Sequence, residues 1–222
     1  SRNNDVDFSE GIAITSGIHP DKNTHIETCR YGKGQGAMSL LATLLVDKHD
    51  YVPRPILWLW KIIRNPFVFL RSINPINVSE KSTYVLVMQT ISNYMRFDYK
   101  RRWWRLGGKS MNSNCDTDQK VPAYIPIANE YTKRLADKIG GDPAASITEI
   151  FLNTSTTAHI MGGCVMADNS DNGVIDYKGK IFGYDNLYIA DGSIVPANLG
   201  VNPSLTITAM SEYILDQIPS KG

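Results

Sequence analysis

The composition of the chain changes near the start of its last third, and this change limits the possible folds more than any other feature of the sequence. Upstream, β-branched runs alternate with apolar helical segments, whereas residues 153–204 are rich in Gly, Asn, Asp and Thr. Such a segment predicts loops around one short strand at 187–190. A helix opened by Pro203 is predicted to follow. We therefore divide the sequence into two domains, 1–152 and 153–222.

The first domain carries the signals of a mixed α/β (α+β) fold with an antiparallel sheet. Alternating or β-branched apolar residues predict strands, and apolar runs punctuated by proline predict helices. The predicted strands are 11–18 (ended by His19-Pro20), 24–31, 82–90 and 93–100, and the predicted helices are 37–46, 51–73 (broken at Pro66) and 122–139. The strand at 82–90 is apolar on both faces and is expected to be central. The strand at 93–100 alternates, so we expect it to be half-buried and to lead into a hairpin turn at Gly107-Gly108.

Composition and charge exclude several classes of protein. With 222 residues, of which 42% are hydrophobic, the chain is long enough to bury a core. A formal net charge of +1 argues against a nucleic-acid binder that depends on bulk attraction to phosphate. Three widely spaced cysteines provide neither a disulfide scaffold nor a CxxC zinc site. We therefore expect a cytoplasmic or membrane-associated protein rather than a disulfide-stabilised secreted one.

The densest motif is TTAHIMGGCVMAD, in which Gly162 and Gly163 closely follow His159. Neutral imidazole exchanges protons near neutral pH. Paired glycines let the backbone pass close to a bulky ligand, because no Cβ intervenes. A histidine in a glycine-rich turn explains the same residues, and the motif alone does not decide between these explanations.

A second motif, ADGSIVPANLGVNPS, leads through Asp191 and Gly192 to a helix that begins at Pro203. The N-terminus of a helix attracts anions, because its first N–H groups are unpaired and lie at the positive end of the helix dipole. Asn202, directly before this helix, is equally well explained as its N-cap.

Together the two motifs resemble the C-terminal signature of the glucose–methanol–choline (GMC) FAD-dependent oxidoreductases, and within them the cholesterol oxidase-like branch. HIMGGCVMAD, NGVID, GKIFGYDNLYIADGS and PANLGVNPSLTITAMSE occur in the family's order at similar spacing. The resemblance is dense over 157–213. One departure is Ile160, since many relatives have proline directly after the histidine. The resemblance implies an antiparallel-sheet substrate-binding domain, followed by the C-terminal strand and helix of an incomplete FAD-binding domain.

The resemblance also implies a reaction. Such enzymes remove the hydroxyl proton of an alcohol and transfer a hydride from the same carbon to N5 of FAD. The implied substrate is a sterol or another bulky apolar alcohol. His159 matches the family's active-site histidine, and Asn202 matches the second polar residue, which orients the substrate oxygen. The residues expected at the cofactor are Asp191, Gly192, Asn202, Pro203 and Ser204.

Glu27, in the predicted strand HIETC, corresponds to the glutamate with which cholesterol oxidases move a proton in steroid double-bond isomerisation. A solvent-facing glutamate on an edge strand explains it as well. The GxGxxG turn that binds the FAD pyrophosphate is not matched, because Gly32–Gly36 has its third glycine one residue early and predicts a loop. We therefore expect an N-terminal FAD-binding segment as a partner of these residues, which do not begin with Met. We expect the 222 residues to be inactive by themselves.

Other functions remain open from the residues alone. The segment ILWLWKII and the basic-aromatic tract Lys100–Arg105 suit a non-catalytic lipid-binding or membrane-surface module. Burial over the sheet and a basic hairpin are the ordinary explanations of these two segments. Cys164 beside His159 suits a thiol hydrolase, although no third group is evident. His19 and His25 lack a third ligand, so no metal is expected.

Overall fold

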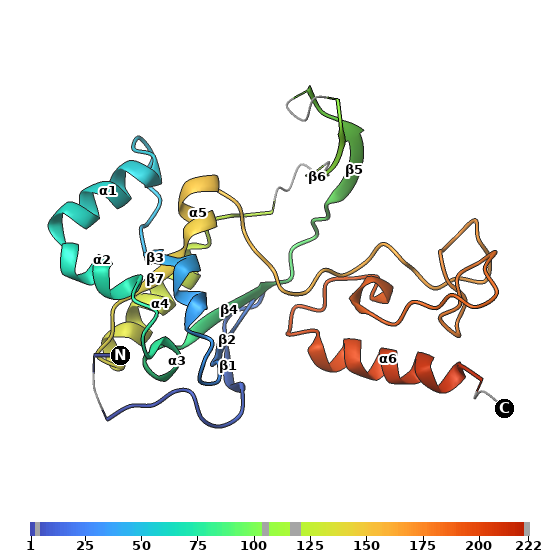
Figure 1. The fold of residues 1–222 in the computed structure, drawn as a ribbon, viewed down its shortest axis with the longest axis horizontal. Coiled ribbons are helices and arrows are strands. Elements are labelled where there is room, and N and C mark those ends of the chain that lie inside the picture. Colours follow the sequence, from blue (N-terminus) through green and yellow to red (C-terminus); the bar gives the residue numbers. More distant parts are fainter. Residues whose placement is uncertain (3–4, 104–106, 116–120, 220–222) are drawn as a thin grey trace. The chain divides into compact units, whose positions relative to one another are not determined.

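The computed structural model describes residues 1–2, 5–103, 107–115 and 121–219 (Figure 1). In chain order its elements are β1 (Ile14–Asp21), β2 (Thr24–Cys29), η1 (Gly36–Leu41), β3 (Ala42–Leu44), α1 (Arg54–Arg64), α2 (Pro66–Ser72), α3 (Val78–Lys81), β4 (Tyr84–Gln89), β5 (Arg96–Arg101), β6 (Lys109–Asn114), α4 (Pro126–Lys138), β7 (Ala144–Ser146), α5 (Ile147–Leu152), η3 (Gly192–Ile194) and α6 (Ser204–Gln217). They fall into two compact units, residues 1–87 with 92–156, and residues 88–91 with 157–222. Helices with small antiparallel sheets confirm the predicted mixed class.

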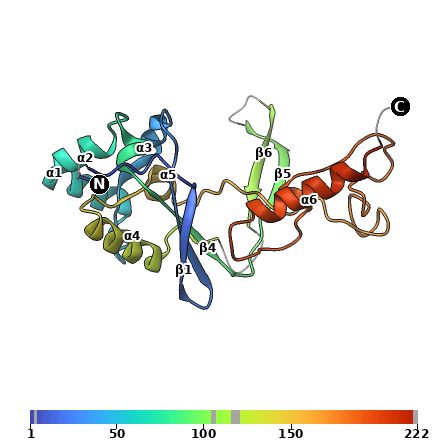
Figure 2. The same cartoon turned by 90° about the horizontal axis from the view of Figure 1, so that it is seen from below.

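Three strands of the first unit form a sheet in the order β1-β2-β4 (Figures 1 and 2). β1 and β2 are antiparallel, with Asp21 opposite Thr24. The prediction that His19-Pro20 ends the first strand is wrong: β1 continues to Asp21, because an edge strand can hold a proline without losing a bond to a neighbour. β4 lies at the other edge, so the expected central position of 82–90 is also wrong for this sheet. An apolar run does not reveal how many neighbours a strand has.

The predicted helix at 37–46 is replaced by the 3-10 helix η1 and the short strand β3. β3 pairs antiparallel with β7, with Ala42 opposite Ser146 and Leu44 opposite Ala144. A tertiary partner overrides helical propensity here, since pairing with β7 buries Leu44 completely. The loop predicted at 32–36 is confirmed, and it leads into η1 rather than into an α-helix.

Two helices, α1 and α2, are separated at Pro66 as predicted. Each has a proline in its first turn, where the missing N–H would be unpaired in any case. The inner side is fixed by Trp58, whose Nε1–H donates to Thr43 Oγ1 at 2.6 Å and whose ring lies edge-on to Phe151 at 4.7 Å between centroids. The outer side exposes the apolar side chains of Ile56, Leu59, Trp60, Ile63, Phe67 and Leu70. Both sides of these helices are therefore apolar, but only the inner side packs on the core.

β5 and β6 form a two-stranded antiparallel ribbon, with Arg101 opposite Lys109 at its closed end. This confirms the predicted hairpin, although Trp104 and Arg105 in its connection lie outside the described residues. The expected half-burial of β5 is wrong within the described part of the chain. Phe97 is 56% exposed, because no second layer of described residues covers that side of the ribbon.

α4 begins at Pro126, four residues later than predicted, because this proline takes the first helical position. It ends before Gly140, as expected. The longest described helix, α6, has 14 residues, and within the described ranges no helix is long and apolar enough to cross a membrane.

The second unit consists of loops packed on α6. Its core comprises four buried side chains, Ile175, Ile194, Val195 and Ile214. The prediction of loops over 153–204 is confirmed. The predicted strand at 187–190 is wrong, because Tyr188 makes only an isolated bridge to Lys180, and a single bridge does not continue into a ladder.

Candidate functional site

Two loops of the second unit run alongside each other and bring the two sequence motifs together. The N–H of Gly162 donates to the carbonyl of Gly192 at 3.3 Å, and the N–H of Cys164 donates to that of Ser193 at 3.0 Å. Gly162 and Gly163 have φ of 80° and 105°, a region that favours glycine. The turn itself therefore requires the paired glycines, whether or not a ligand approaches them.

His159 directly precedes this turn and is half-buried. Its backbone N–H donates to Thr157 Oγ1 at 3.1 Å, which stabilises the start of the loop. Its Nε2 lies 3.5 Å from Ser204 Oγ, at the beginning of α6. The loop thus presents the imidazole to a helix N-terminus.

Asn202 organises that N-terminus. Its Oδ1 accepts hydrogen bonds from the N–H of Ser204 at 3.0 Å and from the Ser204 hydroxyl at 2.7 Å. The Asn202 side chain therefore accepts a helix N–H, as a capping residue does. The N-cap position itself, however, is occupied by the buried Pro203. Beyond Ser204, the first-turn N–H groups of α6 have no intrahelical acceptor.

Ser204 connects the two candidate residues, and sequence reasoning missed this role. Asn-Pro-Ser is a signal for it, since an asparagine side chain commonly bonds the N–H two residues later. The result is a chain of an imidazole, a hydroxyl and a carboxamide at the positive end of a helix. Such a group can accept a proton at the imidazole and orient an oxygen with the carboxamide.

Asp191 lies in the second of the two loops. Its Oδ1 accepts from the N–H of Ser193 at 2.8 Å and from the Ser193 hydroxyl at 2.6 Å. These hydrogen bonds lower the pKa of the Asp191 carboxyl and cap η3. The structure thus gives Asp191 a local structural role, and its place at a cofactor stays a prediction, as does that of Gly192.

Glu27 belongs to the first unit, on β2, the middle strand of its sheet. It is buried, with 9% of its surface exposed, so the alternative of a solvent-facing glutamate on an edge strand is wrong. Its Oε1 lies 3.7 Å from His25 Nε2. A role of Glu27 beside His159 stays a prediction.

The other chemistries considered from the sequence gain no support. In the described residues Cys164 bonds through its backbone to Ser193, and the imidazole of His159 contacts Ser204 rather than the thiol. The rings of His19 and His25 stack on each other at 4.3 Å between centroids. Across the described ranges, no three His, Cys, Asp or Glu side chains are grouped so as to hold a metal ion.

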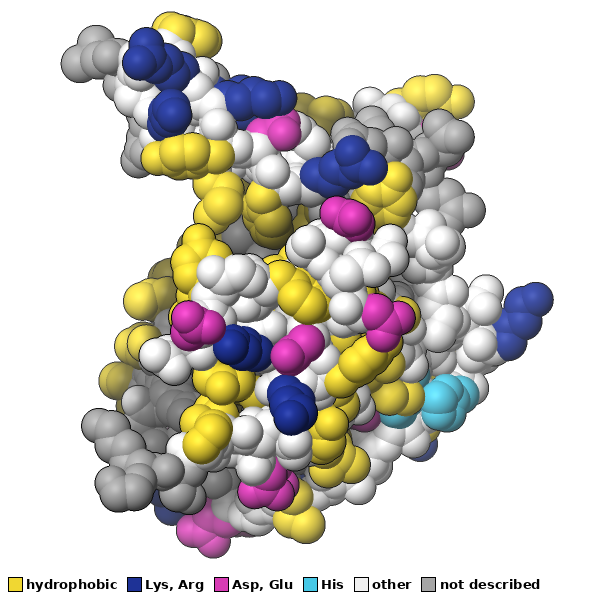
Figure 3. All heavy atoms as spheres, turned by 90° about the vertical axis from the view of Figure 1, so that its right-hand side faces the viewer, with side chains coloured by type: hydrophobic (Ala, Val, Ile, Leu, Met, Phe, Trp, Pro, Cys, Tyr) yellow, Lys and Arg dark blue, Asp and Glu magenta, His cyan; other side chains and the backbone are white. Residues whose placement is uncertain are grey.

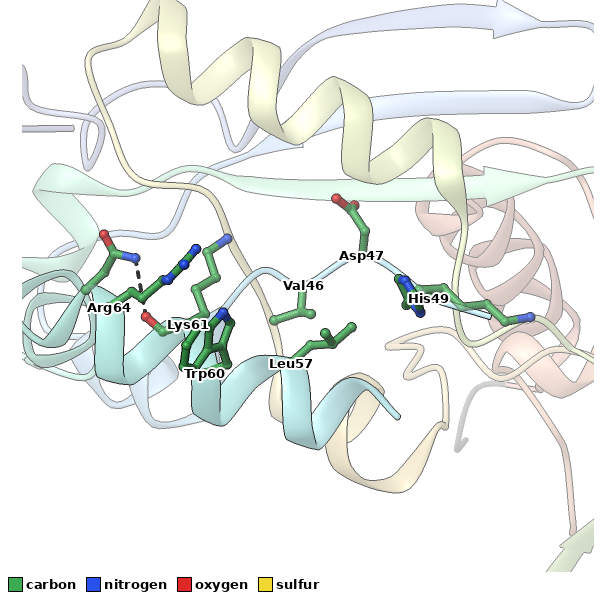
Figure 4. Close-up of a pocket in the computed structure, with 9 residues that line it drawn as sticks. Val46, Asp47, His49, Leu57, Trp60, Lys61 and Arg64 are labelled. Carbon is green, nitrogen blue, oxygen red and sulfur yellow. Dashed lines mark hydrogen bonds between the residues drawn. The ribbon is translucent and has the colours of Figure 1, made fainter. Parts of the chain in front are cut away.

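A pocket of about 400 Å³ lies in the first unit, between α1 and the segment after β3 (Figure 4). Trp60, Lys61 and Arg64 line it from α1, and Asp47 and His49 line it from the other side. None of the predicted site residues lines it. It is therefore a feature separate from the contact between His159 and α6.

Comparison with known proteins identifies similar sequences. A family model described as GMC oxidoreductase matches residues 74–211, which include both motifs. The chain is 44% identical over 217 residues to the cholesterol oxidase of Acinetobacter baumannii and 42% identical over 224 residues to that of Mycobacterium tuberculosis. A long-chain-alcohol oxidase of Arabidopsis thaliana is 33% identical over 82 residues, which is 37% of this chain and 11% of that protein.

The matches cover a much larger share of this chain than of the two cholesterol oxidases. The similarity to the two cholesterol oxidases covers 98% and 99% of this chain but 38% of each of those proteins. The chain thus spans about two fifths of the length of the curated relatives it matches.

Proposed function

This chain belongs to the GMC oxidoreductase family, and from this premise we propose that it is the C-terminal part of an FAD-dependent enzyme that oxidises the CH–OH group of an alcohol. The proposed substrate is a sterol or another bulky apolar alcohol, which becomes a ketone or an aldehyde. Relatives named cholesterol oxidase and long-chain-alcohol oxidase support an apolar substrate. Residues 1–152 contribute to substrate binding, and residues 153–222 form the C-terminal part of the FAD-binding domain.

The observation that carries the proposal is the contact between His159 and the start of α6. His159 Nε2 lies 3.5 Å from Ser204 Oγ, and that hydroxyl is bonded to Asn202 Oδ1. In the proposed reaction His159 accepts the hydroxyl proton of the alcohol, as neutral imidazole does readily near neutral pH. Asn202 donates from its carboxamide nitrogen to the substrate oxygen and so orients the reacting carbon.

The described residues fit the ring end of a flavin. FAD, when bound, supplies the acceptor for the hydride that leaves the alcohol carbon. The first-turn N–H groups of α6 and its dipole provide positive potential for an electron-rich ring edge. Asn202, Pro203 and Ser204 would hold that edge, and the backbone at Asp191 and Gly192 would pass beside it.

We also propose that an FAD-binding segment outside these residues covers part of the second unit. Ile160 is 65% exposed, and on α6 Leu205 is 81% and Leu215 is 59% exposed. Figure 3 shows that many apolar side chains reach the molecular surface. Exposed apolar surface of this kind is typical of an interaction site.

The test uses the intact enzyme that contains this sequence. His159→Gln keeps a polar side chain but removes the base, and Asn202→Ala removes the carboxamide. We expect His159→Gln to bind flavin normally and to slow anaerobic flavin reduction by cholesterol by about 100-fold or more. Asn202→Ala should slow the same step and also weaken flavin binding, because Asn202 holds the flavin edge in the proposed site. His49→Gln, at an exposed histidine of the first unit, is the matched control and should not change the rate. Unchanged reduction in both site variants would refute the proposal.

A second candidate function is binding to a membrane surface, as a lipid-binding module. Its support is the exposed apolar side of α1 and α2, including Trp60, Ile63 and Phe67, in a segment with four basic and no acidic residues over 54–72. The protein would then sediment with vesicles containing anionic phospholipid, and Trp60→Glu would abolish this. Tyr184→Glu, at an exposed aromatic residue of the second unit, is the control. Equal sedimentation of the Trp60 variant and the unaltered protein would refute this function.

A further inference from the structure

The pocket beside α1 is lined by three basic side chains. Lys61 and Arg64 belong to the last turn of α1, and Lys48 lies on the segment after β3. With a volume of about 400 Å³, the pocket is within the range in which proteins bind small ligands. In Figure 4 the side chains of Lys61 and Arg64 both extend from α1 on the side of the pocket. Positive charge is therefore gathered in a hollow of the surface.

The charge of Lys61 is compensated only in part by the protein. Its side chain is half-buried, and its ammonium group donates to the carbonyl of Leu45 at 2.7 Å. A carbonyl is a neutral acceptor and does not balance a positive charge. Burial lowers the pKa of Lys61, the nearby charge of Lys133 lowers it further, and Asp47 opposes this shift without reversing it. An anion in the pocket would stabilise the charged ammonium group.

Arg64 and Lys48 are available to a ligand. Within the described ranges neither of these side chains forms an ion pair with a carboxylate. The guanidinium carbon of Arg64 lies over the ring of Trp60, 4.6 Å from the ring centroid. Such a contact uses the face of the guanidinium and leaves its N–H edge available to two oxygens of one ligand. Phosphate presents its oxygens in this arrangement, and arginine commonly binds it through two parallel hydrogen bonds.

Negative groups near the pocket do not cancel its positive charge. The carboxylate of Asp47 accepts from Asn129 Nδ2 at 3.0 Å and pairs with Lys133, and both partners belong to α4. Figure 4 shows Asp47 directed toward that helix and away from Trp60. The C-terminal end of α1 contributes about half a negative charge through the helix dipole, against three full positive charges. The groups that line the pocket therefore leave it positive.

We propose that this pocket binds the phosphate group of a ligand through Lys48, Lys61 and Arg64. The phosphate belongs either to a lipid head group or to a free phosphate ester, and both present the same charged oxygens. In the first case the acyl chains would meet Leu59 and Ile63, which are 54% and 64% exposed on the outer side of the same helix. The site is independent of the proposed oxidation, because no residue of the contact between His159 and α6 contributes to it.

The test measures phosphate binding by the intact enzyme with its flavin bound, so that the flavin site cannot take up the added phosphate. Isothermal titration calorimetry with inorganic phosphate, at an ionic strength held constant with chloride, gives the affinity. Arg64→Gln and Lys48→Gln alter exposed side chains, and each should weaken binding about tenfold by removing a charged donor. Arg71→Gln is the matched control: this half-exposed arginine of α2 pairs with Asp142, and its loss should leave the affinity unchanged.

A second measurement distinguishes the two sources of the phosphate. The enzyme is sedimented with vesicles of phosphatidylcholine that contain about one fifth phosphatidic acid, with and without free glycerol 3-phosphate. For a lipid head group, Arg64→Gln should weaken sedimentation about tenfold and glycerol 3-phosphate should compete with the vesicles. For a free ester, the variant and the unaltered enzyme should sediment equally, and the variant should bind glycerol 3-phosphate about tenfold more weakly. Either result supports the phosphate site and assigns its ligand.

The site is refuted if the Arg64 and Lys48 variants bind inorganic phosphate as tightly as the unaltered enzyme, or if the unaltered enzyme binds none at about 10 mM. That result would leave the proposed oxidation standing, because flavin reduction by an alcohol and its loss in His159→Gln are measured without phosphate. Unchanged flavin reduction in the His159 and Asn202 variants, together with weakened phosphate binding in the Arg64 variant, would instead refute only the oxidation.

Discussion

Replacing Arg54 by methionine is expected to destabilise the first unit by about 3 kcal/mol at neutral pH. The guanidinium is 7% exposed. It donates to Glu149 Oε1 at 2.6 Å, to the Glu149 carbonyl at 2.8 Å and to Asn153 Oδ1 at 2.7 Å. It also lies over the ring of Tyr124, 5.5 Å from the centroid. These contacts join the start of α1 to α5, and methionine preserves only the apolar part of the side chain.

The magnitude follows from the charge that remains. Removing one member of a buried ion pair costs about 3–5 kcal/mol, because the other member stays uncompensated. The lower end applies here, since the Glu149 side chain is 19% exposed and can take up a proton. Burial raises the pKa of Glu149 above its ordinary value of 4.5, and Arg54 opposes this rise.

Without Arg54 the pKa of Glu149 rises further. The loss in the free energy of unfolding caused by Arg54→Met therefore depends on pH. A carboxyl whose pKa is higher in the folded state favours folding below its unfolded pKa and loses that contribution as the pH rises through the folded pKa. The variant is therefore expected to lose less stability near pH 4.5 than at neutral pH.

Urea unfolding followed by tryptophan fluorescence measures this loss, because Trp58 and Trp60 lie on α1, the helix that begins at Arg54. Arg71→Met is the matched control: Arg71 is 50% exposed and its ion pair with Asp142 should contribute less than about 1 kcal/mol. Adding Glu149→Gln to the Arg54 variant should recover part of the loss at neutral pH. A loss below about 1 kcal/mol, or an equal loss at both pH values, would contradict the reasoning.

Two further predictions each concern the hydrogen bonds to one acceptor oxygen. Trp58→Phe keeps an aromatic ring but leaves Thr43 Oγ1 without its 2.6 Å donor, so we expect a loss of about 1–2 kcal/mol by urea unfolding. A loss near zero would mean that the hydroxyl finds another partner. Asp191→Asn should lower the Tm at neutral pH, because hydrogen bonds from Ser193 lower the pKa of Asp191 from 3.8 and favour the folded state above that value. This stabilisation is lost as the pH falls through the folded pKa, so a Tm difference that persists in stronger acid would oppose this interpretation.

Local signals in the sequence predicted several elements correctly. Pro66 separates two helices, and the final helix begins directly after Pro203. These elements follow from the fixed φ and missing N–H of proline, which act whatever surrounds them. The predicted helix at 37–46 failed because β3 gains a partner in β7, about a hundred residues later, and such pairing leaves no local signal.

The candidate site shows the same division. The sequence by itself determined which groups are available, since His159, Asn202 and the start of α6 follow from residue chemistry and helix-capping rules. Only the tertiary structure decided that Ser204 joins His159 to Asn202, because that contact spans 45 residues and depends on how two loops pack on one helix. It likewise decided that Glu27 is buried beside His25, since the register of β1 against β2 brings Gly17 opposite the pair. Residue types set the chemistry that is possible, and burial and register set which groups meet.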